Sequence, residues 1–287
     1  MSTNGKSQIE ALMAQIEEMW GHQDVLFKRI SEANDWDRKH GPDWTFADAP
    51  YHLAYCNRDL VARPIEYGRD LPAEEQILFR SSTELNAWNA RKFAERPASQ
   101  TIEETLAQLE ASRDEIRRVV AGLTDADLDR TAWFPIQLTG GDGWMAARIP
   151  LMFCLTHDWS EFMQLRIHMG AKGPVPSPGI TTQYLGGTIA MAFPMFLDRE
   201  AADGESFTAV FDFSDPGVSP FALRVANGEV AVEPGKPGDA DLVLTQSAET
   251  FERTFRGITT FPDAIQSGAI QVSDMEGLAK FGALFPM

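Results

Sequence analysis

Three side chains in this sequence, His52, His157 and Glu161, are of types that bind divalent metal ions. His157 and Glu161 are four residues apart, so in a helix they leave the same face one turn apart. Two imidazoles and one carboxylate, with the remaining positions left to water, form a metal site of the catalytic type. The spacing His-x3-Glu also arises often by chance. From spacing alone, a surface ion pair or a hydrogen bond within one helix is the better interpretation.

Each of the two cysteines shares a helix face with one of these histidines. Cys56 follows His52 by four residues, and Cys154 precedes His157 by three. A closed site of two cysteines and two histidines is therefore an alternative, and it would hold zinc for structural purposes. Free cysteines are usually small buried residues that face a core, and we favour this interpretation for both. If the metal site exists, the two thiols are its expected neighbours.

The other histidines are not expected to complete the site. His168 returns to nearly the same helix face as His157 but lies roughly 16 Å further along the axis, a distance that one ion does not span. His168 is better suited to be a cation at the helix C-terminus, near Gly170. His22 and His40 stand in polar sequence without a pattern, and we predict both at the surface.

Helices must position these residues, because the first half of the chain has helical periodicity and capping signals. Ser7-x-x-Glu10 and Thr101-x-x-Glu104 are capping boxes, which start helices. The predicted helices run from residue 7 to before Gly41-Pro42, from Asp48 to about Ala62, from Thr101 to Gly122, and from after loop 139–143 to Gly170. We predict that residues 1–172 form an all-α, up-down four-helix bundle.

The periodicity changes in the second half of the chain. Residues 173–182 are rich in proline and glycine and are predicted to be a linker. Apolar and polar residues alternate over Phe207–Phe213, as in a strand with one buried face. The dipeptide Asn227-Gly228 is a strong hairpin signal between two further strands. We therefore predict an α+β domain over residues 183–287, with a small, mostly antiparallel sheet.

Composition narrows the classes of partner and location. The chain carries 25 Lys+Arg against 42 Asp+Glu, and the net charge of −17 repels nucleic acid and anionic membrane surfaces. The apolar stretch Tyr184–Leu197 contains glycines and a proline and is shorter than the roughly 20 residues of a membrane span. Two cysteines are too few for a disulfide framework, and the N-terminus lacks the pattern of a signal peptide. We expect a cytoplasmic protein that binds no nucleic acid.

Segments of the first half resemble the DinB-like family, which includes the thiol-dependent maleylpyruvate isomerases. Asp48–Val61 (DAPYHLAYCNRDLV) is similar to that family's second helix, in which a histidine is the first metal ligand. His157–Leu165 (HDWSEFMQL) is similar to the motif of its last helix, and Thr124–Arg130 to a helix-turn stretch. The resemblance covers about residues 7–170.

The resemblance implies roles for individual residues. His52 and His157 take the places of two metal ligands, and Glu161 takes the place of the third. Many members carry histidine at the position of Glu161, so the site here would be more anionic. Gln164 falls on a glutamine that would orient a ligand. Arg58 would meet an anionic substrate, although a helix arginine of this kind is more often a salt-bridge partner.

The same resemblance implies a function. We expect a metal-dependent enzyme that uses a low-molecular-weight thiol, such as mycothiol, bacillithiol or glutathione, for S-transfer or isomerisation of a small electrophilic substrate. A divalent metal lowers the pKa of a bound thiol, so a thiolate nucleophile exists at neutral pH. We expect zinc first, although two histidines and one carboxylate also suit nickel, manganese and iron. A homodimer is compatible with this expectation.

The last segment, Asp241–Pro286, resembles the C-terminal half of the sterol carrier protein family, which forms an apolar tunnel between sheet and helices. The matching features are a strand, a helix that ends in F-R-G, the segment D-A-I-Q-S-G, and a last helix with Phe281 and Leu284. The apolar side chains of this half either line such a tunnel or fill a core. The alternative function is therefore a non-catalytic protein that binds an apolar ligand such as a lipid, with a structural or vestigial metal site.

Overall fold

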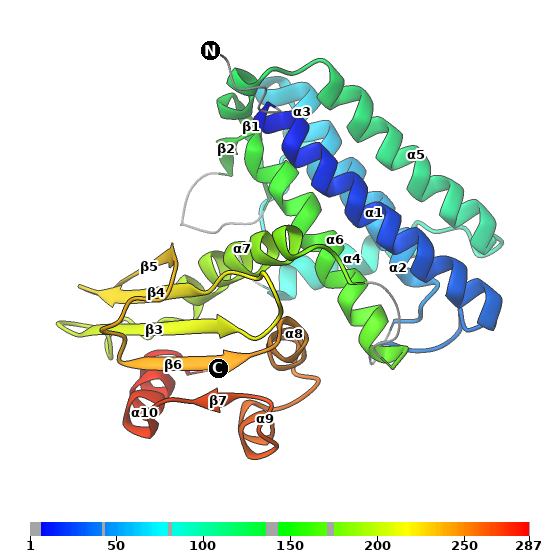
Figure 1. Ribbon diagram of the computed structural model, residues 1–287. Helices are drawn as coiled ribbons and strands as arrows, with labels where there is room; N and C mark the ends of the chain where they lie inside the picture. The colour runs from blue at the N-terminus through cyan, green and yellow to red at the C-terminus, as the bar shows by residue number, and fades with distance from the viewer. Residues whose placement is uncertain (1–6, 42–43, 80–81, 136–142, 171–174, 287) are drawn as a thin grey trace, which may run out of the picture. The chain divides into compact units, whose positions relative to one another are not determined.

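The computed structural model describes residues 7–41, 44–79, 82–135, 143–170 and 175–286. The chain divides into two compact units, Met1–Leu165 and Arg166–Met287 (Figure 1), and each is described by itself. The first unit is mainly helical, and the second contains the larger sheet. The predicted domain bounds, 1–172 and 183–287, stay a proposal.

The first unit consists of helices and one short pair of strands. Its longer helices are α1 (Gln8–Ala33), α2 (Asp48–Cys56), α4 (Ser82–Ala94), α5 (Ile102–Ala121) and α6 (Arg148–His168). Its shorter helical elements are the π-helix η1 (Asn57–Ala62), the helix α3 (Arg63–Tyr67), and the 3-10 helices η2 (Gly68–Asp70), η3 (Ala73–Glu75) and η4 (Asp125–Asp129). The antiparallel strands are β1 (Thr131–Trp133) and β2 (Trp144–Ala146).

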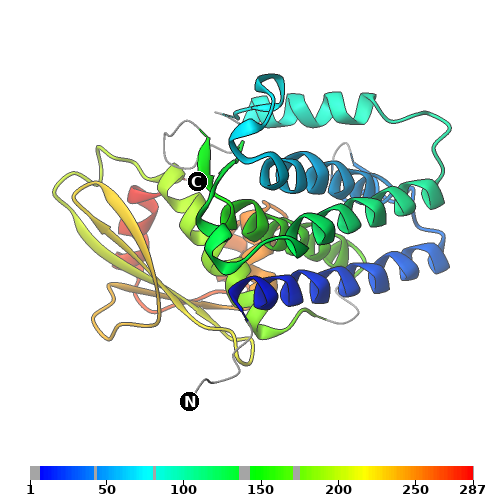
Figure 2. The ribbon, with the colours of Figure 1, turned by 90° about the horizontal axis from the view of Figure 1, so that it is seen from above.

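Local sequence accounts for where the long helices begin. Both predicted capping boxes form, Ser7 with Glu10 at the start of α1 and Thr101 with Glu104 at the start of α5. In Figure 2, α5 lies between α1 and α2, and α4 lies on the other side of α2. The prediction of a mainly helical first half is confirmed, whereas the up-down four-helix topology stays a prediction.

The end predicted for the second helix is wrong, whereas the first helix ends before Gly41, as predicted. Its last residue is Ala33, because Asn34 adopts the left-handed conformation (φ 53°) that stops a helix. The second helix does not stop before Pro64 but continues through η1 into α3. A proline clashes with the carbonyl one turn before it in an α-helix, and the wider π-helical turn accommodates it.

The second unit packs helices against a five-stranded sheet. Its helices are α7 (Pro178–Phe196), α8 (Ala248–Phe255), α9 (Phe261–Gln266) and α10 (Met275–Leu284). Its strands are β3 (Ser206–Phe213), β4 (Phe221–Ala226), β5 (Glu229–Pro234), β6 (Leu242–Gln246) and β7 (Gln271–Val272). The sheet order is β5-β4-β3-β6-β7, with only β3 and β6 parallel among these described strands. The predicted α+β fold with a mostly antiparallel sheet is thus confirmed.

The predicted hairpin forms at Asn227-Gly228. Both residues have positive φ, 53° and 73°, as a tight turn between twisted strands requires. Aromatic side chains fill the space beside the sheet. The ring of Phe193 on α7 lies 5.1 Å from that of Phe211 and 5.4 Å from that of Phe285. These phenylalanines therefore pack on one another as a core does.

The predicted linker is too long. Helix α7 begins at Pro178, inside the predicted stretch 173–182, with Ser177 at its N-cap position. Proline suits the first turn of a helix, since the N–H that it lacks would have no partner within the helix there. Residues 178–182 are therefore helical, and residues 171–174 lie outside the described part of the chain. Among the described helices, none is both long and apolar enough to cross a membrane.

Candidate metal centre

Helix α2 holds His52 in the interior of the first unit. The carboxylate of Asp48, the first residue of α2, accepts hydrogen bonds from the N–H and the hydroxyl of Thr45 at 2.7 and 2.8 Å. Each α2 residue from Ala49 to Cys56 is buried, because the helix packs against both α4 and α5. The His52 side chain is 5% exposed. Packing of α2 against α4 and α5 therefore fixes the position of His52.

The two predicted histidine ligands meet. Nε2 of His52 on α2 lies 2.9 Å from Nε2 of His157 on α6, across 105 residues of sequence. His157 stacks on Phe153, one turn earlier in α6, with ring centroids 4.9 Å apart. Two imidazole nitrogens at this distance cannot both present lone pairs to each other. Either one carries a proton, or both share a cation.

Cys56 completes a cluster of three metal-binding side chains. Its Sγ lies 3.8 Å from Nδ1 and 3.9 Å from Nε2 of His52. One ligand atom each from His52, Cys56 and His157 lies within 4.8 Å of the others. Imidazole and thiolate ligands suit zinc. Cys154 is not a member of this cluster among the described residues, so the closed two-cysteine, two-histidine site is not formed here.

The second nitrogen of each imidazole faces an oxygen atom, as is usual for metal-binding histidines. Nδ1 of His52 lies 2.5 Å from the hydroxyl of Tyr55, which donates to Oδ1 of Asn89 at 3.0 Å. Nδ1 of His157 lies 3.8 Å from Oδ1 of Asp158. Sequence reasoning found none of these three oxygen-bearing residues. The missed helix α4 carries Asn89, and the spacing of Leu85 and Trp88 on its buried side was the available signal.

Asp158 is a buried carboxylate next to the cluster. The side chain is 1% exposed, and its Oδ2 accepts the indole N–H of Trp20 at 2.7 Å. Gln23 donates to the Asp158 carbonyl at 3.2 Å. Among the described residues, Oδ1 of Asp158 is buried without a hydrogen-bond partner. This oxygen faces Nδ1 of His157 at 3.8 Å.

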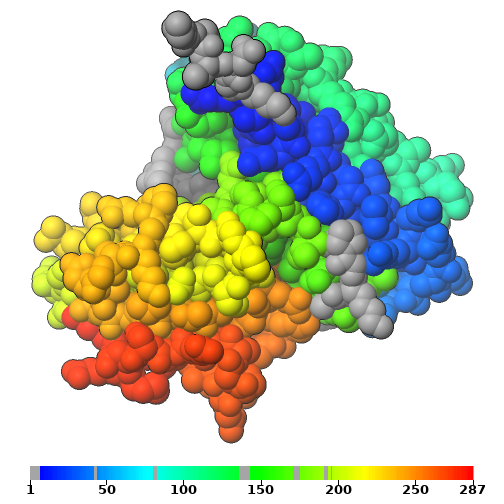
Figure 3. Space-filling model, in the orientation of Figure 1, coloured from blue at the N-terminus to red at the C-terminus, as the bar shows by residue number. Residues whose placement is uncertain are grey.

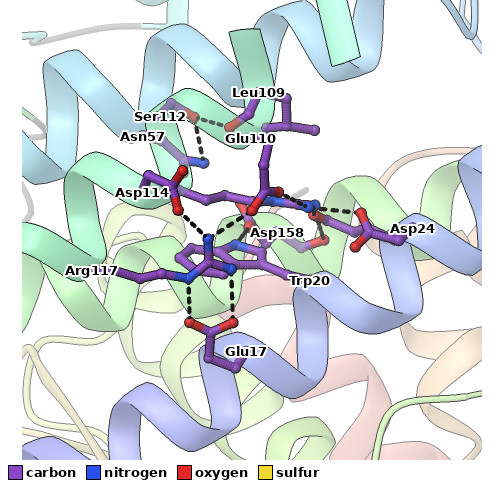
Figure 4. A network of polar contacts seen from close by, with 12 residues as sticks. Glu17, Trp20, Asp24, Asn57, Leu109, Glu110, Ser112, Asp114, Arg117 and Asp158 are labelled. Atoms are coloured by element: carbon purple, nitrogen blue, oxygen red, sulfur yellow. Dashed lines mark hydrogen bonds and ion pairs between the residues drawn. The ribbon is translucent and has the colours of Figure 1, made fainter. Parts of the chain in front are cut away.

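A polar network connects Asp158 to the surface of α1 and α5 (Figure 4). Arg113, 2% exposed, donates to Oε1 of Gln23 at 2.8 Å and to Asp24 at 2.7 Å. Arg117 binds both carboxylate oxygens of Glu17 at 2.7 and 2.9 Å. Both helices present an outer face at the surface (Figure 3), where the acidic partners lie. The network ties α1 and α5 to the helix that carries His157.

Glu161, the third predicted ligand, is buried on α6 and 4% exposed. Burial raises the pKa of the Cys56 thiol well above its usual value, and the negative charge of Glu161 raises it further. Burial, Cys56 and Glu161 in that order raise the pKa of Tyr55 as well. Glu161 therefore acts electrostatically on the cluster, and these anionic surroundings favour a cation at the two imidazoles. Its role as a ligand stays a prediction.

The other predicted site residues make contacts of their own. Gln164 donates to the carbonyl of His40 at 3.3 Å. Arg58 forms a two-point ion pair with the neighbouring Asp59, at 2.6 and 3.2 Å, as the salt-bridge interpretation anticipates. Cys154 is 1% exposed, and its Sγ lies 3.7 Å from Oδ1 of Asn57. The roles of Gln164 and Arg58 in the site stay predictions.

The surface prediction is wrong for His40, and His22 is of intermediate exposure. His40 is 2% exposed and packs its ring against Trp44 and Phe46, with centroids 6.1 and 5.9 Å away. The neighbouring residue Lys39 forms an antiparallel β-bridge with Thr45. His22 is only partly exposed, and its ring lies 6.0 Å from that of Phe162. Polar neighbours in sequence did not reveal these contacts.

Aromatic rings surround the cluster on its partly exposed side. Trp44 meets His52 edge to face with centroids 4.8 Å apart, and Phe93 lies 4.9 Å from Trp44. Trp44, Phe93 and Phe153 are all of intermediate exposure. The His157 side chain is 15% exposed. These rings limit the access of water to the imidazoles without covering them completely.

Comparison with known proteins identifies similar sequences and folds. The sequence profile described as the DinB superfamily matches residues 15–162, about half of the chain. A second profile, described as the alkyl sulfatase C-terminal family, matches residues 190–286. No curated protein sequence matches this chain.

Two solved structures with TM-scores above 0.5 share the fold at low sequence identity. The mycothiol-dependent maleylpyruvate isomerase is 14% identical with a TM-score of 0.53, over 95% of this chain and 96% of that chain. A histidine-to-alanine variant of that isomerase is 13% identical with a TM-score of 0.51 over the same shares. The UbiJ-SCP2 ubiquinone synthesis protein is 19% identical with a TM-score of 0.28, over 35% of this chain and 91% of that chain.

Proposed function

The chain belongs to the DinB superfamily, and on this premise we propose that it is a metal-dependent enzyme. It uses a low-molecular-weight thiol for S-transfer or isomerisation of a small electrophilic substrate. The observation that carries the proposal is the 2.9 Å approach of Nε2 of His52 to Nε2 of His157. The shared fold with a mycothiol-dependent maleylpyruvate isomerase supports the choice of thiol chemistry.

The proposed ligands are His52, His157 and one of two further side chains. Glu161 is the third ligand predicted from sequence, and its charge acts on the cluster. Cys56 is the alternative, because its Sγ already lies within 4.8 Å of the histidine nitrogens. Zinc suits either set, and the set with Glu161 also suits nickel, manganese or iron. A divalent metal bound there supplies a Lewis acid and lowers the pKa of a bound thiol or water.

The chain's own residues have separate tasks in this proposal. Tyr55 holds the outer nitrogen of His52 by a hydrogen bond, and the carboxylate of Asp158 faces the outer nitrogen of His157 at 3.8 Å. Trp44, Phe93 and Phe153 limit the access of water to the imidazoles, which strengthens electrostatic interactions at the site. The proposal assigns the metal site to residues 1–172 and the sterol carrier protein-like fold to residues 183–287.

Metal analysis of the purified full chain tests the proposal. We expect about one metal ion per chain in the wild type and less than about a tenth of that in His52→Ala and His157→Ala. The control is His168→Ala, on the same helix as His157, which should keep the metal. Loss in Glu161→Gln but not in Cys56→Ser assigns the third ligand to the carboxylate, and the reverse result assigns it to the thiol.

Activity is tested separately with the metal-loaded chain. Mycothiol, bacillithiol and glutathione are each offered with electrophiles such as maleylpyruvate, and loss of free thiol or change of isomer is followed. Thiol-dependent turnover that disappears in His157→Ala supports the proposal. Bound metal without turnover, together with lipid found in the native protein by mass spectrometry, would instead support the apolar-ligand protein.

A further inference from the structure

We propose that Tyr55 and Asn89 are positioning residues that fix the tautomer of His52, so that Nε2 of His52 carries a lone pair and not a proton. The part of this inference that concerns metal affinity rests on the proposed function. The part that concerns the tautomer does not, because it describes the imidazole itself.

Counting protons along the chain of hydrogen bonds gives the tautomer. The Tyr55 hydroxyl has one proton, and it is donated to Oδ1 of Asn89, an oxygen that only accepts. The 2.5 Å contact between the Tyr55 oxygen and Nδ1 of His52 therefore needs its proton from Nδ1. In a neutral imidazole one nitrogen is protonated and the other is not. Nε2 of His52 is thus the nitrogen with the lone pair, and it is the one that faces His157.

Packing keeps the tyrosine in this orientation. Tyr55 is 1% exposed, and its ring meets the ring of Trp88 edge to face at 5.2 Å and that of Tyr51 at 5.6 Å. Phe93 closes another side at 5.9 Å. A side chain enclosed in this way cannot rotate its hydroxyl away from both partners. We call the chain of hydrogen bonds from His52 through Tyr55 to Asn89 the relay. It connects Asn89 on α4 to the imidazole of His52 on α2.

The partner imidazole complements this arrangement. With a lone pair on Nε2 of His52, the 2.9 Å contact is satisfied when His157 holds its proton on Nε2. The alternative place for that proton is Nδ1 of His157, which lies 3.8 Å from the buried Oδ1 of Asp158. His157 can therefore present its own Nε2 lone pair by moving one proton, while His52 needs no change. The relay thus leaves His52 with its Nε2 lone pair available to a metal ion before any metal binds.

The tautomer is tested in the full chain labelled with 15N-histidine and freed of metal with a chelator. Long-range 15N–1H correlations distinguish a protonated Nδ1 from a protonated Nε2, and His52→Gln identifies the His52 signals by their loss. We expect a protonated Nδ1 in the wild type. In Asn89→Ala the tyrosine proton loses its acceptor and turns to Nδ1, so we expect Nε2 to be protonated. Asn89→Asp keeps an acceptor and should restore the wild-type pattern.

Matched controls and a second variant make the outcome decisive. Tyr51→Phe, one turn earlier in α2, and Asn86→Ala, one turn earlier in α4, should leave the His52 tautomer unchanged. Tyr55→Phe removes the acceptor of the Nδ1 proton and should give a mixture of tautomers. A protonated Nε2 in the wild type, or one unchanged tautomer in Tyr55→Phe and Asn89→Ala, overturns the proposal.

Zinc affinity, measured by chelator competition, provides the second readout. We expect Tyr55→Phe and Asn89→Ala to bind zinc about 10- to 100-fold more weakly than the wild type, and Asn89→Asp to bind it nearly as well. Equal affinities in all variants would contradict a role in metal binding. A wild type that binds no metal would overturn the proposed metal site. The tautomer measurement would still show whether Tyr55 and Asn89 fix the protonation of His52.

Discussion

The indole N–H of Trp20 on α1 bonds to the carboxylate of Asp158 on α6 at 2.7 Å, and both side chains are 1% exposed. Asp158 is the residue next to His157, so this single bond links the first helix to the candidate metal centre. A buried carboxylate that loses a donor retains the cost of its desolvation. Both the stability of the first unit and the placement of His157 therefore depend on this hydrogen bond between Trp20 and Asp158.

Trp20→Phe should lower the free energy of unfolding by at least about 1–3 kcal/mol, because it removes the indole N–H and leaves Asp158 short of a donor. Urea unfolding followed by circular dichroism measures the change. The matched control is Trp36→Phe, whose indole bonds to Ser31 in an exposed setting, with an expected loss of under about 1 kcal/mol. If both variants lose the same free energy of unfolding, the Trp20–Asp158 hydrogen bond does not stabilise the fold more than an exposed indole contact does.

Arg113→Met should cost about 1–3 kcal/mol of unfolding free energy. The loss comes mainly from Gln23, whose buried Oε1 is left without its donor, because Asp24 and Glu110 are 60% and 50% exposed and regain water. Arg118→Met on the same helix breaks ion pairs with Glu66 and Glu115 at a solvent-exposed guanidinium, and it should destabilise the fold much less than Arg113→Met does. Denaturant unfolding at low and high salt distinguishes the two, since only the Arg118 effect should fade with salt.

Gly186→Ala should destabilise the second unit by about 1–3 kcal/mol through overpacking. A Cβ at this position would lie 2.6 Å from two ring carbons of Phe221. The control is Gly282→Ala in helix α10, where nothing lies within 4 Å of the added Cβ. That variant should be neutral or gain up to about 1 kcal/mol from helix propensity. Thermal unfolding of both variants gives the comparison, and a destabilised Gly282→Ala would contradict the explanation.

Stability should fall at alkaline pH partly because of Cys154. Burial raises the pKa of the Cys154 thiol well above its usual value, so the unfolded chain loses this proton first as the pH rises past about 8.5. Above that pH the unfolded state is favoured, and the free energy of unfolding decreases. Between about pH 8 and about pH 10, the decrease should be smaller in Cys154→Ala than in the wild type. Urea unfolding with a reductant and a chelator present measures both, and equal decreases would refute the assignment.

The sequence predicted features that depend on local chemistry. The capping boxes at Ser7 and Thr101 and the turn at Asn227-Gly228 are decided within four residues, and all three form. The approach of His52 to His157 was reached only through a family resemblance. Spacing along one helix says nothing about which residue another helix brings to it.

Other features depend on contacts between distant segments and left no comparable signal. The hydroxyl that faces His52 belongs to Tyr55, whose own acceptor Asn89 lies on a helix that was not predicted. The carboxylate that faces His157 belongs to Asp158, the residue next to a predicted ligand. The parallel pairing of β3 with β6 depends on a crossover that strand patterns do not encode. His40 is buried and packs its ring against Trp44 and Phe46. In each case contacts that form only in the folded chain determined the structure, and the residues nearby in sequence did not indicate it.

The π-helical turn η1 amounts to a one-residue insertion in an otherwise continuous helical rod from Asp48 to Tyr67. Each residue of an α-helix advances by about 100°, so the extra residue rotates all later side chains relative to those before it. The residues before the π-helical turn, which include His52 and Cys56 of the metal cluster, therefore follow a different angular register from those after it. Arg63, which pairs with Glu75, belongs to the second group. An alignment with a chain whose helix is regularly α-helical through this stretch should therefore place a gap within Asn57–Ala62, because an ungapped comparison would assign the wrong face to every residue beyond it.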